Sequence, residues 1–420
     1  MIRPNLAWRS VAVLSAAALA LTACADDSED TPTPGGSSAA AAAVGDGTLK
    51  IGSLLPQTGS LAILGPPEIA GVNLAISEIN AAGGVLGKPV VVSHTDSGDT
   101  STDIATQSVN KLLAEGVDAI VGAASSSVSL SVIDKITGAG VVQFSPANTS
   151  DEFTTYADKG LYFRTAPPDQ LQGRVLGDLI IQDGNAKVGL LVMQDSYGTG
   201  LAKSTRAAVE GAGGQIAAEA VYDPKAADFS AEVDQIKTAN PDAIVLIGFD
   251  EVSKIIPKLV EAGLTTDKKK WYFVDGNLSN KYTFPAGTLK GAKGTLPGAA
   301  AGKDFEEKMK KIDPSLVDFS YGPESYDATN LIALAAELAK SDAPAAIAAN
   351  LKAASEGGTK CKDFASCLTL IKAGTDFDYD GVSGPVSFNA AGDPSEATIG
   401  IYQYGDDNKY TNVDYKSGKI

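Results

Sequence analysis

The sequence predicts an α/β protein made of two doubly wound parallel-sheet lobes that are joined by three crossovers. Short β-branched runs alternate with amphipathic helical stretches from Leu49 onward, an order typical of parallel sheets with helices on both faces. The order starts again near Val188, and Asp118-Ala-Ile-Val121 recurs as Asp242-Ala-Ile-Val245, which indicates two similar halves. The 420 residues are enough for two such lobes.

Composition excludes several classes of function. The chain is 44% hydrophobic and 20% charged, which favours a packed core over disorder. Its net charge of −17 repels phosphate backbones, so nucleic-acid binding is not expected. With one histidine and three cysteines, a His-rich or Cys-rich metal site is not expected either.

The first residues have the features of an export signal. Arg3 and Arg9 precede an apolar run, Val11–Leu21, which has signal-peptide length and is too short to span a bilayer. Leu21-Thr22-Ala23-Cys24 resembles a bacterial lipobox. The sequence therefore predicts that residues 1–23 are a lipoprotein signal peptide and that Cys24 is lipidated. An ordinary cleaved signal with a chance cysteine is the alternative.

The segment that follows predicts a flexible tether over residues 24–47, because it is rich in Asp, Ser, Thr, Pro, Gly and Ala. We expect an exported protein, held at the outer face of the cytoplasmic membrane by its lipid alone. In an oxidising compartment, the nearby Cys361 and Cys367 are expected to form a disulfide. A redox or metal role for this pair is the alternative.

In the first lobe, strands and helices alternate, and Gly83-Gly84 ends the first helix. The expected elements are strand Leu49–Leu55, helix Glu68–Ala82, strand Val90–Ser93, helix Asp103–Glu115, strand Ala119–Gly122, helix Ser129–Ala139 and strand Val141–Ser145.

The second lobe repeats this order. The expected elements are strand Val188–Met193, helix Gly200–Gly211, strand Gln215–Val221, helix Ala231–Thr238, strand Ala243–Gly248, helix Val252–Ala262 and strand Trp271–Val274. A further helix is expected over Tyr326–Ala339, and crossovers at Arg164–Pro168, Gly291–Ala301 and Val382–Gly392. One lobe is then residues 48–165 with 299–388, and the other 166–298 with 389–420.

Ligands of open parallel sheets lie beyond the carboxyl ends of the strands, and two loops there predict a carboxylate site. Ser125-Ser126-Ser127 precedes a helix, whose free N–H groups and dipole favour an anion. Thr149, in the loop after Ser145, is placed to donate to the same anion. Helix capping by serine and an ordinary capped loop are the alternatives.

The corresponding loops of the second lobe hold Tyr197, which is placed to cover a small ligand, and Asp275, which is placed to pair with an ammonium group. A surface aromatic and a turn aspartate are the alternatives. No Gly-x-Ser-x-Gly elbow or phosphate-binding Walker pattern occurs. His94, the single imidazole, is interpreted as structural, although a hydrolase that uses His94 or a carboxylate pair stays open. No catalytic residue, metal or cofactor is predicted.

A set of short motifs then points to a family. The motifs are Gln57-Thr58-Gly59, Ala81-Ala-Gly-Gly-Val-Leu-Gly87, Ser145-Pro-Ala147, Phe163-Arg-Thr165, Tyr197-Gly198 and Tyr326-Asp-Ala328. Together they resemble type I periplasmic solute-binding proteins of ABC importers, and the leucine/isoleucine/valine-binding branch in particular. The resemblance covers nearly all of residues 48–405.

This resemblance implies a set of ligand-binding residues. The solute carboxylate is held by Ser126, with Ser127 beside it, and by Ala147 and Thr149; Tyr197 stacks on the solute; Phe249 is an aromatic wall; and Asp275 pairs with the ammonium group. Two positions depart from the family pattern, since Asp275 is one methylene shorter than the usual Glu and Leu64 replaces an aromatic residue.

The resemblance also implies a function without catalysis. The expected protein is a lipid-anchored, monomeric substrate-binding protein that delivers a branched-chain or related amino acid to ABC permease subunits. The alternatives are an amide, urea or aromatic acid as solute, or a sensor that reports ligand to a signalling partner.

Overall fold

The computed structural model describes residues 45–299 and 301–420. The expected signal peptide 1–23, Cys24 and all of the expected tether except residues 45–47 lie outside the described residues. Within the described ranges, no helix combines the length and the apolar character needed to cross a membrane. Nor do these ranges contain three His, Cys, Asp or Glu side chains grouped to hold a metal ion.

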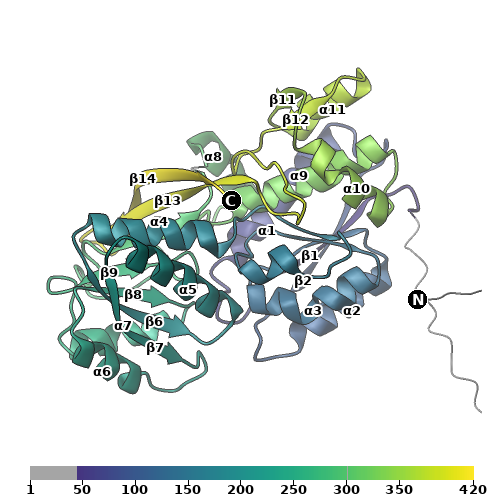
Figure 1. Cartoon of the computed structure of the whole chain (residues 1–420). Helices are drawn as coiled ribbons and strands as arrows, with labels where there is room; N and C mark the ends of the chain where they lie inside the picture. Colours follow the sequence, from purple (N-terminus) through teal and green to yellow (C-terminus); the bar gives the residue numbers. More distant parts are fainter. Residues whose placement is uncertain (1–44, 300) are drawn as a thin grey trace, which may run out of the picture. The chain divides into compact units, whose positions relative to one another are not determined.

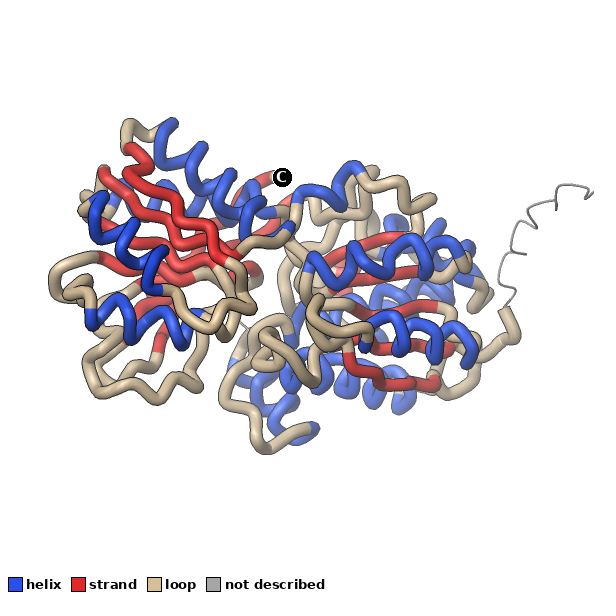
Figure 2. The backbone as a smooth tube through the Cα atoms, turned by 90° about the horizontal axis from the view of Figure 1, so that it is seen from below, coloured by secondary structure: helices blue, strands red, loops and turns tan. Residues whose placement is uncertain are grey.

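The first sheet has five strands in the order β2-β1-β3-β4-β5, and all its neighbours are parallel. The strands are β1 (Lys50–Leu55), β2 (Val91–Asp96), β3 (Ala119–Gly122), β4 (Val142–Ser145) and β5 (Tyr162–Arg164). Successive side chains point to opposite faces, so Ala119 and Val121 pack on one side while Ile120 packs on the other. Helices therefore cover both faces (Figures 1 and 2).

Three long helices pack on one face of this sheet and two on the other. The first set is α1 (Gly65–Ala81), α9 (Gly322–Ala339) and α10 (Pro344–Ala354), and the second is α2 (Ile104–Glu115) and α3 (Ser126–Gly138). A 3-10 helix, η1 (Asp151–Thr155), lies between β4 and β5, and α8 (Lys303–Ile312) packs on α1.

The second sheet has seven strands in the order β14-β13-β10-β9-β8-β6-β7. Its parallel part contains β6 (Lys187–Met193), β7 (Gln215–Tyr222), β8 (Ala243–Ile247), β9 (Lys270–Phe273) and β10 (Lys293–Pro297). Two antiparallel strands extend its edge, namely β13 (Glu396–Tyr404) and β14 (Tyr410–Lys419). The surrounding helices are α4 (Asp169–Gln182), α5 (Ser196–Gly211), α6 (Ser230–Ala239) and α7 (Val252–Glu261).

The α/β class with two parallel-sheet lobes is thus confirmed, with one addition, because the antiparallel β13–β14 pair was not expected. The chain moves between the sheets three times: after β5, after β10 and before β13. The second crossover was placed wrongly in part, since residues 293–297 of the expected segment Gly291–Ala301 form strand β10. The lobe boundaries at 165/166, 298/299 and 388/389 stay a prediction.

Helix α4 is an element that the sequence pattern does not predict, because Gly173 and Gly177 lower the helix propensity of the segment. The structure gives these glycines a packing role. A Cβ added at Gly173 would lie 2.5 Å from the Cβ of Ser204, and one at Gly177 would lie 2.5 Å from the Cβ of Ala208. The absence of side chains lets α4 pack closely against α5.

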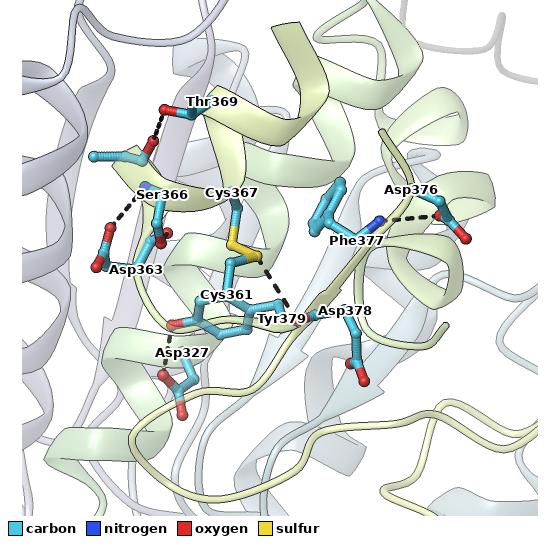
Figure 3. The surroundings of a disulfide bond; sticks show 11 residues. Asp327, Cys361, Asp363, Ser366, Cys367, Thr369, Asp376, Phe377, Asp378 and Tyr379 are labelled. Carbon is cyan, nitrogen blue, oxygen red and sulfur yellow. Dashed lines mark hydrogen bonds between the residues drawn. A yellow bond between two sulfur atoms is a disulfide. The ribbon is translucent and has the colours of Figure 1, made fainter. Parts of the chain in front are cut away.

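A disulfide joins Cys361, in β11 (Thr359–Cys361), to Cys367, in α11 (Phe364–Lys372) (Figure 3). The neighbouring strand β12 (Phe377–Tyr379) pairs with β11 in a small parallel sheet. Tyr379 of β12 donates a hydrogen bond of 2.7 Å to the Asp327 carboxylate of α9, which ties this subregion to the core (Figure 3).

We expect the double substitution Cys361→Ser/Cys367→Ser to lower the free energy of unfolding by about 2 kcal/mol, because the closed loop is short and its closure entropy is correspondingly small. Urea unfolding of the oxidised protein and of the variant measures the difference. An unfolding free energy that does not change would contradict the expectation. Solute affinity serves as the control, since neither cysteine lines the cleft described below.

Candidate functional site

A cleft between the carboxyl ends of the two sheets brings together loops from both lobes. Its walls contain Leu61, Leu64, Ala124, Ser125, Ser126, Ala147, Tyr197, Phe249, Asp275, Gly276 and Tyr321. The cavity that they enclose is about 10 Å³, room for roughly one water molecule. A solute the size of an amino acid therefore enters only if the walls move apart.

Ser126 lies in the first turn of α3, at the end of the helix where main-chain N–H groups lack partners within the helix. The helix starts three residues before the expected Ser129, because Ser125 caps it by accepting a hydrogen bond of 3.4 Å from the Val128 N–H. The Ser126 hydroxyl accepts a hydrogen bond of 3.3 Å from the Ser150 N–H, so its own proton is available to an acceptor in the cleft.

The loop after β4 is fixed against the loop after β3. Ser145 Oγ donates a hydrogen bond of 2.7 Å to the Ala123 carbonyl, and the Asn148 amide donates one of 2.8 Å to the Ala124 carbonyl. Ala147 lines the cleft, but its N–H already donates to Ser145 Oγ at 3.2 Å. The N–H groups around α3 are therefore better placed than that of Ala147 to bind an anion.

A buried ion pair supports the same loop from behind. Arg164 and Asp393 are both fully buried, and Arg164 Nε donates to Asp393 Oδ1 at 2.6 Å. Arg164 Nη1 donates to the Ser150 carbonyl at 2.8 Å and to the Asn148 carbonyl at 3.2 Å. Since Arg164 ends β5 and Asp393 precedes β13, the pair also joins the first and third connections between the sheets.

Asp275 supplies the buried acidic group of the cleft. Its carboxylate accepts hydrogen bonds of 2.7 Å from Tyr197, 2.7 Å from Tyr321 and 2.8 Å from the Gln172 amide. Burial raises the pKa of Asp275, while the three hydrogen bonds act in the opposite direction. A fixed, buried carboxylate of this kind attracts a cationic group into a desolvated cleft.

Two aromatic rings form the apolar wall. Tyr197 and Phe249 stack with their ring centroids 5.3 Å apart and an angle of 17° between the planes. Tyr197 was expected in a loop, but it lies in the first turn of α5. Asp195 caps this helix by accepting a hydrogen bond of 2.7 Å from the Gly198 N–H. Leu61 and Leu64 lie on the first-lobe side of the cavity.

Of the seven expected ligand-binding residues, the structure brings Ser126, Ala147, Tyr197, Phe249 and Asp275 to one cavity, and leaves Ser127 and Thr149 outside its walls. Ser127 instead connects the lobes.

The Ser127 hydroxyl donates a hydrogen bond of 2.9 Å to Asp195, and it accepts one of 3.3 Å from the Ser196 N–H. A second contact between the lobes is the hydrogen bond of 3.1 Å from the Asp250 N–H to the Ser60 carbonyl. Thr149 is buried, and its carbonyl accepts a hydrogen bond of 2.7 Å from the Asp169 N–H.

Tyr321 and Gln172 are site residues that sequence reasoning missed. Tyr321 precedes α9 with a φ of 59°, a left-handed conformation that is unusual for a bulky residue. Gln172 lies on α4, the helix that was not predicted. The sequence marked these residues only by their position. Tyr321 lies five residues before Tyr326, where a helix was expected, and Gln172 follows the expected crossover Arg164–Pro168.

His94 does not form the alternative hydrolytic centre. Its ring nitrogens hydrogen bond to Ser53 Oγ at 2.7 Å and Asn73 Oδ1 at 2.9 Å. Burial lowers the pKa of the ring. Among the described residues no carboxylate hydrogen bonds to it, so the Ser-His-Asp arrangement is missing there.

Comparison with known proteins identifies the family. The sequence model of the periplasmic binding protein family matches residues 48–408. The chain belongs to the periplasmic binding protein family. Its members bind solutes and are not enzymes, so this periplasmic binding protein is a solute-binding protein.

Curated relatives cover almost the same part of the chain. This periplasmic binding protein is 28% identical over 373 residues to a Leu/Ile/Val-binding protein homolog 1 of Brucella suis, an alignment that covers 86% of this chain and 92% of the relative. It is also 28% identical over 370 residues to the leucine-, isoleucine-, valine-, threonine-, and alanine-binding protein of Pseudomonas aeruginosa, with 87% and 92% covered.

Solved structures of solute-binding proteins also match this chain. The branched-chain amino acid transporter substrate binding protein LivJ of Streptococcus pneumoniae, in complex with isoleucine, matches with a TM-score of 0.72 and 25% identity, covering 89% of this chain and 100% of that one. An R. palustris solute binding protein in complex with benzoate matches with a TM-score of 0.70 at 18% identity, covering 89% and 98%. At that identity the likeness is one of fold.

We expect Arg164→Met to lower the free energy of unfolding by about 3–5 kcal/mol, because it leaves the Asp393 carboxylate buried without its partner. Urea unfolding checks this, with Arg174→Met as the control, since Arg174 lies on the exposed side of α4 and contacts the Lys419 carbonyl. A loss below about 1 kcal/mol, or an equal loss in the control, would show that the ion pair does not hold the loop.

Proposed function

We propose that this protein is the substrate-binding component of an ABC importer and that it binds an aliphatic, branched-chain amino acid in the cleft between its lobes. The solute is bound and passed on without chemical change. The observation that carries the proposal is a cleft that offers a site for an anion, a site for a cation and an apolar wall to one small solute.

The amino-terminal end of α3 is the proposed carboxylate site. Helix starts attract anions through unpaired N–H groups and the helix dipole. The Ser126 hydroxyl has a free proton to donate there, because it accepts its other hydrogen bond from Ser150. Ser125 and Ala147 complete the proposed site as part of its wall.

Asp275, on the opposite lobe, is the proposed partner of the ammonium group. A carboxylate has about four acceptor positions, and Tyr197, Tyr321 and Gln172 occupy three of them. The three donors fix the carboxylate in one orientation and leave capacity for one more. Asp275 has a side chain one methylene shorter than the Glu of the family pattern. In this proposal the fixed orientation of its carboxylate compensates for the shorter side chain.

The space between Leu61, Leu64 and the stacked Tyr197–Phe249 pair is the proposed side-chain pocket. These walls offer no charged group, so an aliphatic side chain is favoured over a charged one. The relatives named for leucine, isoleucine and valine support the same class of solute.

A solute that contacts both lobes favours the closed form, because it binds that form more tightly. In this proposal the permease subunits recognise the closed surface. Binding and release then depend on the lobes moving apart, in agreement with a closed cavity of about 10 Å³.

We expect leucine, isoleucine and valine each to bind in calorimetric titrations, and at 100 times the dissociation constant each should stabilise the protein by about 2.7 kcal/mol. Isovalerate and isobutylamine, which keep only one of the two charged groups, should bind much more weakly. Urea, acetamide and benzoate test the other solute classes. Tighter binding of any of these three would overturn the amino-acid assignment.

Within the same titrations, Ser126→Ala and Asp275→Asn should each weaken binding by about 1–3 kcal/mol, the cost of a lost hydrogen bond to a charged group. Ser131→Ala and Asp178→Asn are matched controls, because both residues are exposed and lie on α3 and α4 away from the cleft. Unchanged affinity in both site variants would refute the assignment of these residues.

We also propose that the mature chain begins at a lipidated Cys24 and is held at the outer face of the cytoplasmic membrane. The lipobox-like segment Leu21–Cys24 supports this. Expressed with residues 1–23 in a bacterial host, the protein should fractionate with membranes, and Cys24→Ala should lose the lipid mass. Mass spectrometry of the native amino terminus showing an unmodified Cys24 would rule out the anchor.

A further inference from the structure

A second cavity lies beside the crossover that follows β10. Its volume is about 310 Å³, at the small end of the range for sites that bind small molecules. Its walls come from the β10 end, the β13–β14 pair, α8, and the segment that leads into α9. The three strands belong to the second sheet, whereas α8 and α9 pack on α1 beside the first sheet, so the cavity lies at a connection between the lobes and not within one of them.

The lining of this cavity is aromatic and acidic. Five aromatic residues line it, and three carboxylates, whereas no lysine or arginine does so among the described residues. The aromatic residues are Phe319, Tyr321, Tyr402, Tyr410 and Tyr415, and the acidic residues are Glu306, Asp318 and Glu324. We call this set the tyrosine cavity.

Glu324 is the buried acidic residue of this set whose carboxyl group receives no hydrogen bond from another described residue. Its side chain is 3% exposed, although it lines the cavity. No other described residue donates a hydrogen bond to its carboxyl group, and burial raises its pKa to about 8. One of its oxygens would lie 2.2 Å from a Cβ at Gly298, so a glycine at this point of the crossover leaves room for the carboxyl group.

Of the other two acidic groups of the wall, Glu306 is half-buried and Asp318 already has hydrogen-bond donors. Asp318 accepts a hydrogen bond of 2.8 Å from the Tyr410 hydroxyl and two from Ser320. Tyr410 also packs edge-on against Tyr402, with ring centroids 5.2 Å apart and 78° between the planes. The tyrosines are thus held in place. Glu324 remains as the buried carboxyl group of the wall to which no other described residue donates a hydrogen bond.

The protein itself places a cation on this aromatic cluster. The Lys310 ammonium lies 5.2 Å from the centre of the Phe319 ring, within the range of a cation–π contact. Aromatic faces and a carboxylate together attract organic ammonium ions, because the ring faces carry partial negative charge and the alkyl groups gain apolar contact. An anion would be repelled by the Glu306 and Asp318 carboxylates, and by Glu324 once it is ionised.

We propose that the tyrosine cavity is a second binding site, distinct from the cleft, for a small organic ammonium cation that pairs with Glu324 and contacts the faces of Tyr402, Tyr410 and Tyr415. An apolar solute would leave the Glu324 carboxyl without a partner. A bare divalent metal ion fits less well, since the described residues hold no group of ligands placed for one.

The second site has a direct structural connection to the cleft. Tyr321 lines both cavities, and its hydroxyl donates a hydrogen bond of 2.7 Å to Asp275. A cation that displaces the Tyr321 ring would therefore change the position of a donor to the cleft carboxylate. The proposed second site stands without the amino-acid assignment of the cleft, because none of its own contacts depends on that solute.

The test is a calorimetric titration of the mature chain with choline and with 3,3-dimethylbutan-1-ol, which has the same shape and no charge. We expect choline to bind at least tenfold more tightly. Methylammonium and tetramethylammonium extend the series to smaller cations. Equal affinity for choline and its neutral analogue, or no binding of any of the three cations at millimolar concentration, would overturn the proposal.

Glu324→Gln keeps the shape of the side chain and should weaken choline binding at least tenfold. Glu307→Gln, the same substitution at an exposed position on α8, is the control. Should Glu324→Gln fail to fold, Tyr415→Leu at the partly exposed edge of the cavity replaces it, with a several-fold loss expected. Unchanged choline affinity in the variant used would refute the site.

The pH dependence gives an independent readout. Choline pairs with the charged form of Glu324, whose pKa of about 8 makes the neutral form predominate at pH 7. Choline affinity should therefore rise from pH 6 to pH 9 and level off above the pKa. The acidic groups that act on this carboxyl are Glu68 of α1 and Asp327 of α9, and it interacts in turn with the Tyr321 and Tyr402 hydroxyls. Glu306 and Asp318 line the same cavity.

The rise with pH should vanish in Glu324→Gln. A rise that persists in this variant would assign the pH dependence to one of the neighbouring groups and would contradict the pairing. Leucine titrated into the same samples reports on the cleft separately, so a failure of the second site is distinguishable from a failure of the proposed function.

Discussion

The buried ion pair of Arg164 and Asp393 is the interaction on which the geometry of the cleft depends. Arg164 is the last residue of β5, and its guanidinium holds the carbonyls of Asn148 and Ser150, so the loop that carries Ala147 cannot move independently of the sheet. Asp393 brings the returning chain to the same point. Burying this ion pair costs desolvation energy. In return, the pair fixes the connection after β5, the connection before β13 and the loop that forms one wall of the site.

The sequence predicted the strands and helices of residues 49–145 and 188–274 and helix α9, because β-branched runs and helix-ending glycines mark those elements without any tertiary information. It did not predict β5, α4, α8, α10, α11 or the strands β10 to β14. In α4, Gly173 and Gly177 oppose helix formation locally and are explained only by the neighbouring α5. Strand β14 is exposed along most of its length and has no apolar run, so its pairing with β13 is what makes it a strand.

The sequence predicted those residues of the candidate site that come shortly after recognisable strands. Ser126, Tyr197 and Asp275 each follow a buried strand, and each reaches the cavity. Ser127 shows the limit of that reasoning, because adjacent residues at a helix start point in different directions, and only the second lobe decides which of them faces Asp195. Tyr321 comes from a turn with positive φ, which no local pattern marks.

The Ser127–Asp195 hydrogen bond and the main-chain bond from Asp250 to Ser60 connect the lobes through the protein alone. Contacts of this kind lower the free energy of the shut form whether or not cargo is inside. A ligand-free receptor in the closed form has the same outer surface as the ligand-bound receptor, so the two compete for binding to the transporter. Stronger contacts of this kind therefore favour closure of the empty receptor and so increase its unproductive binding to the transporter.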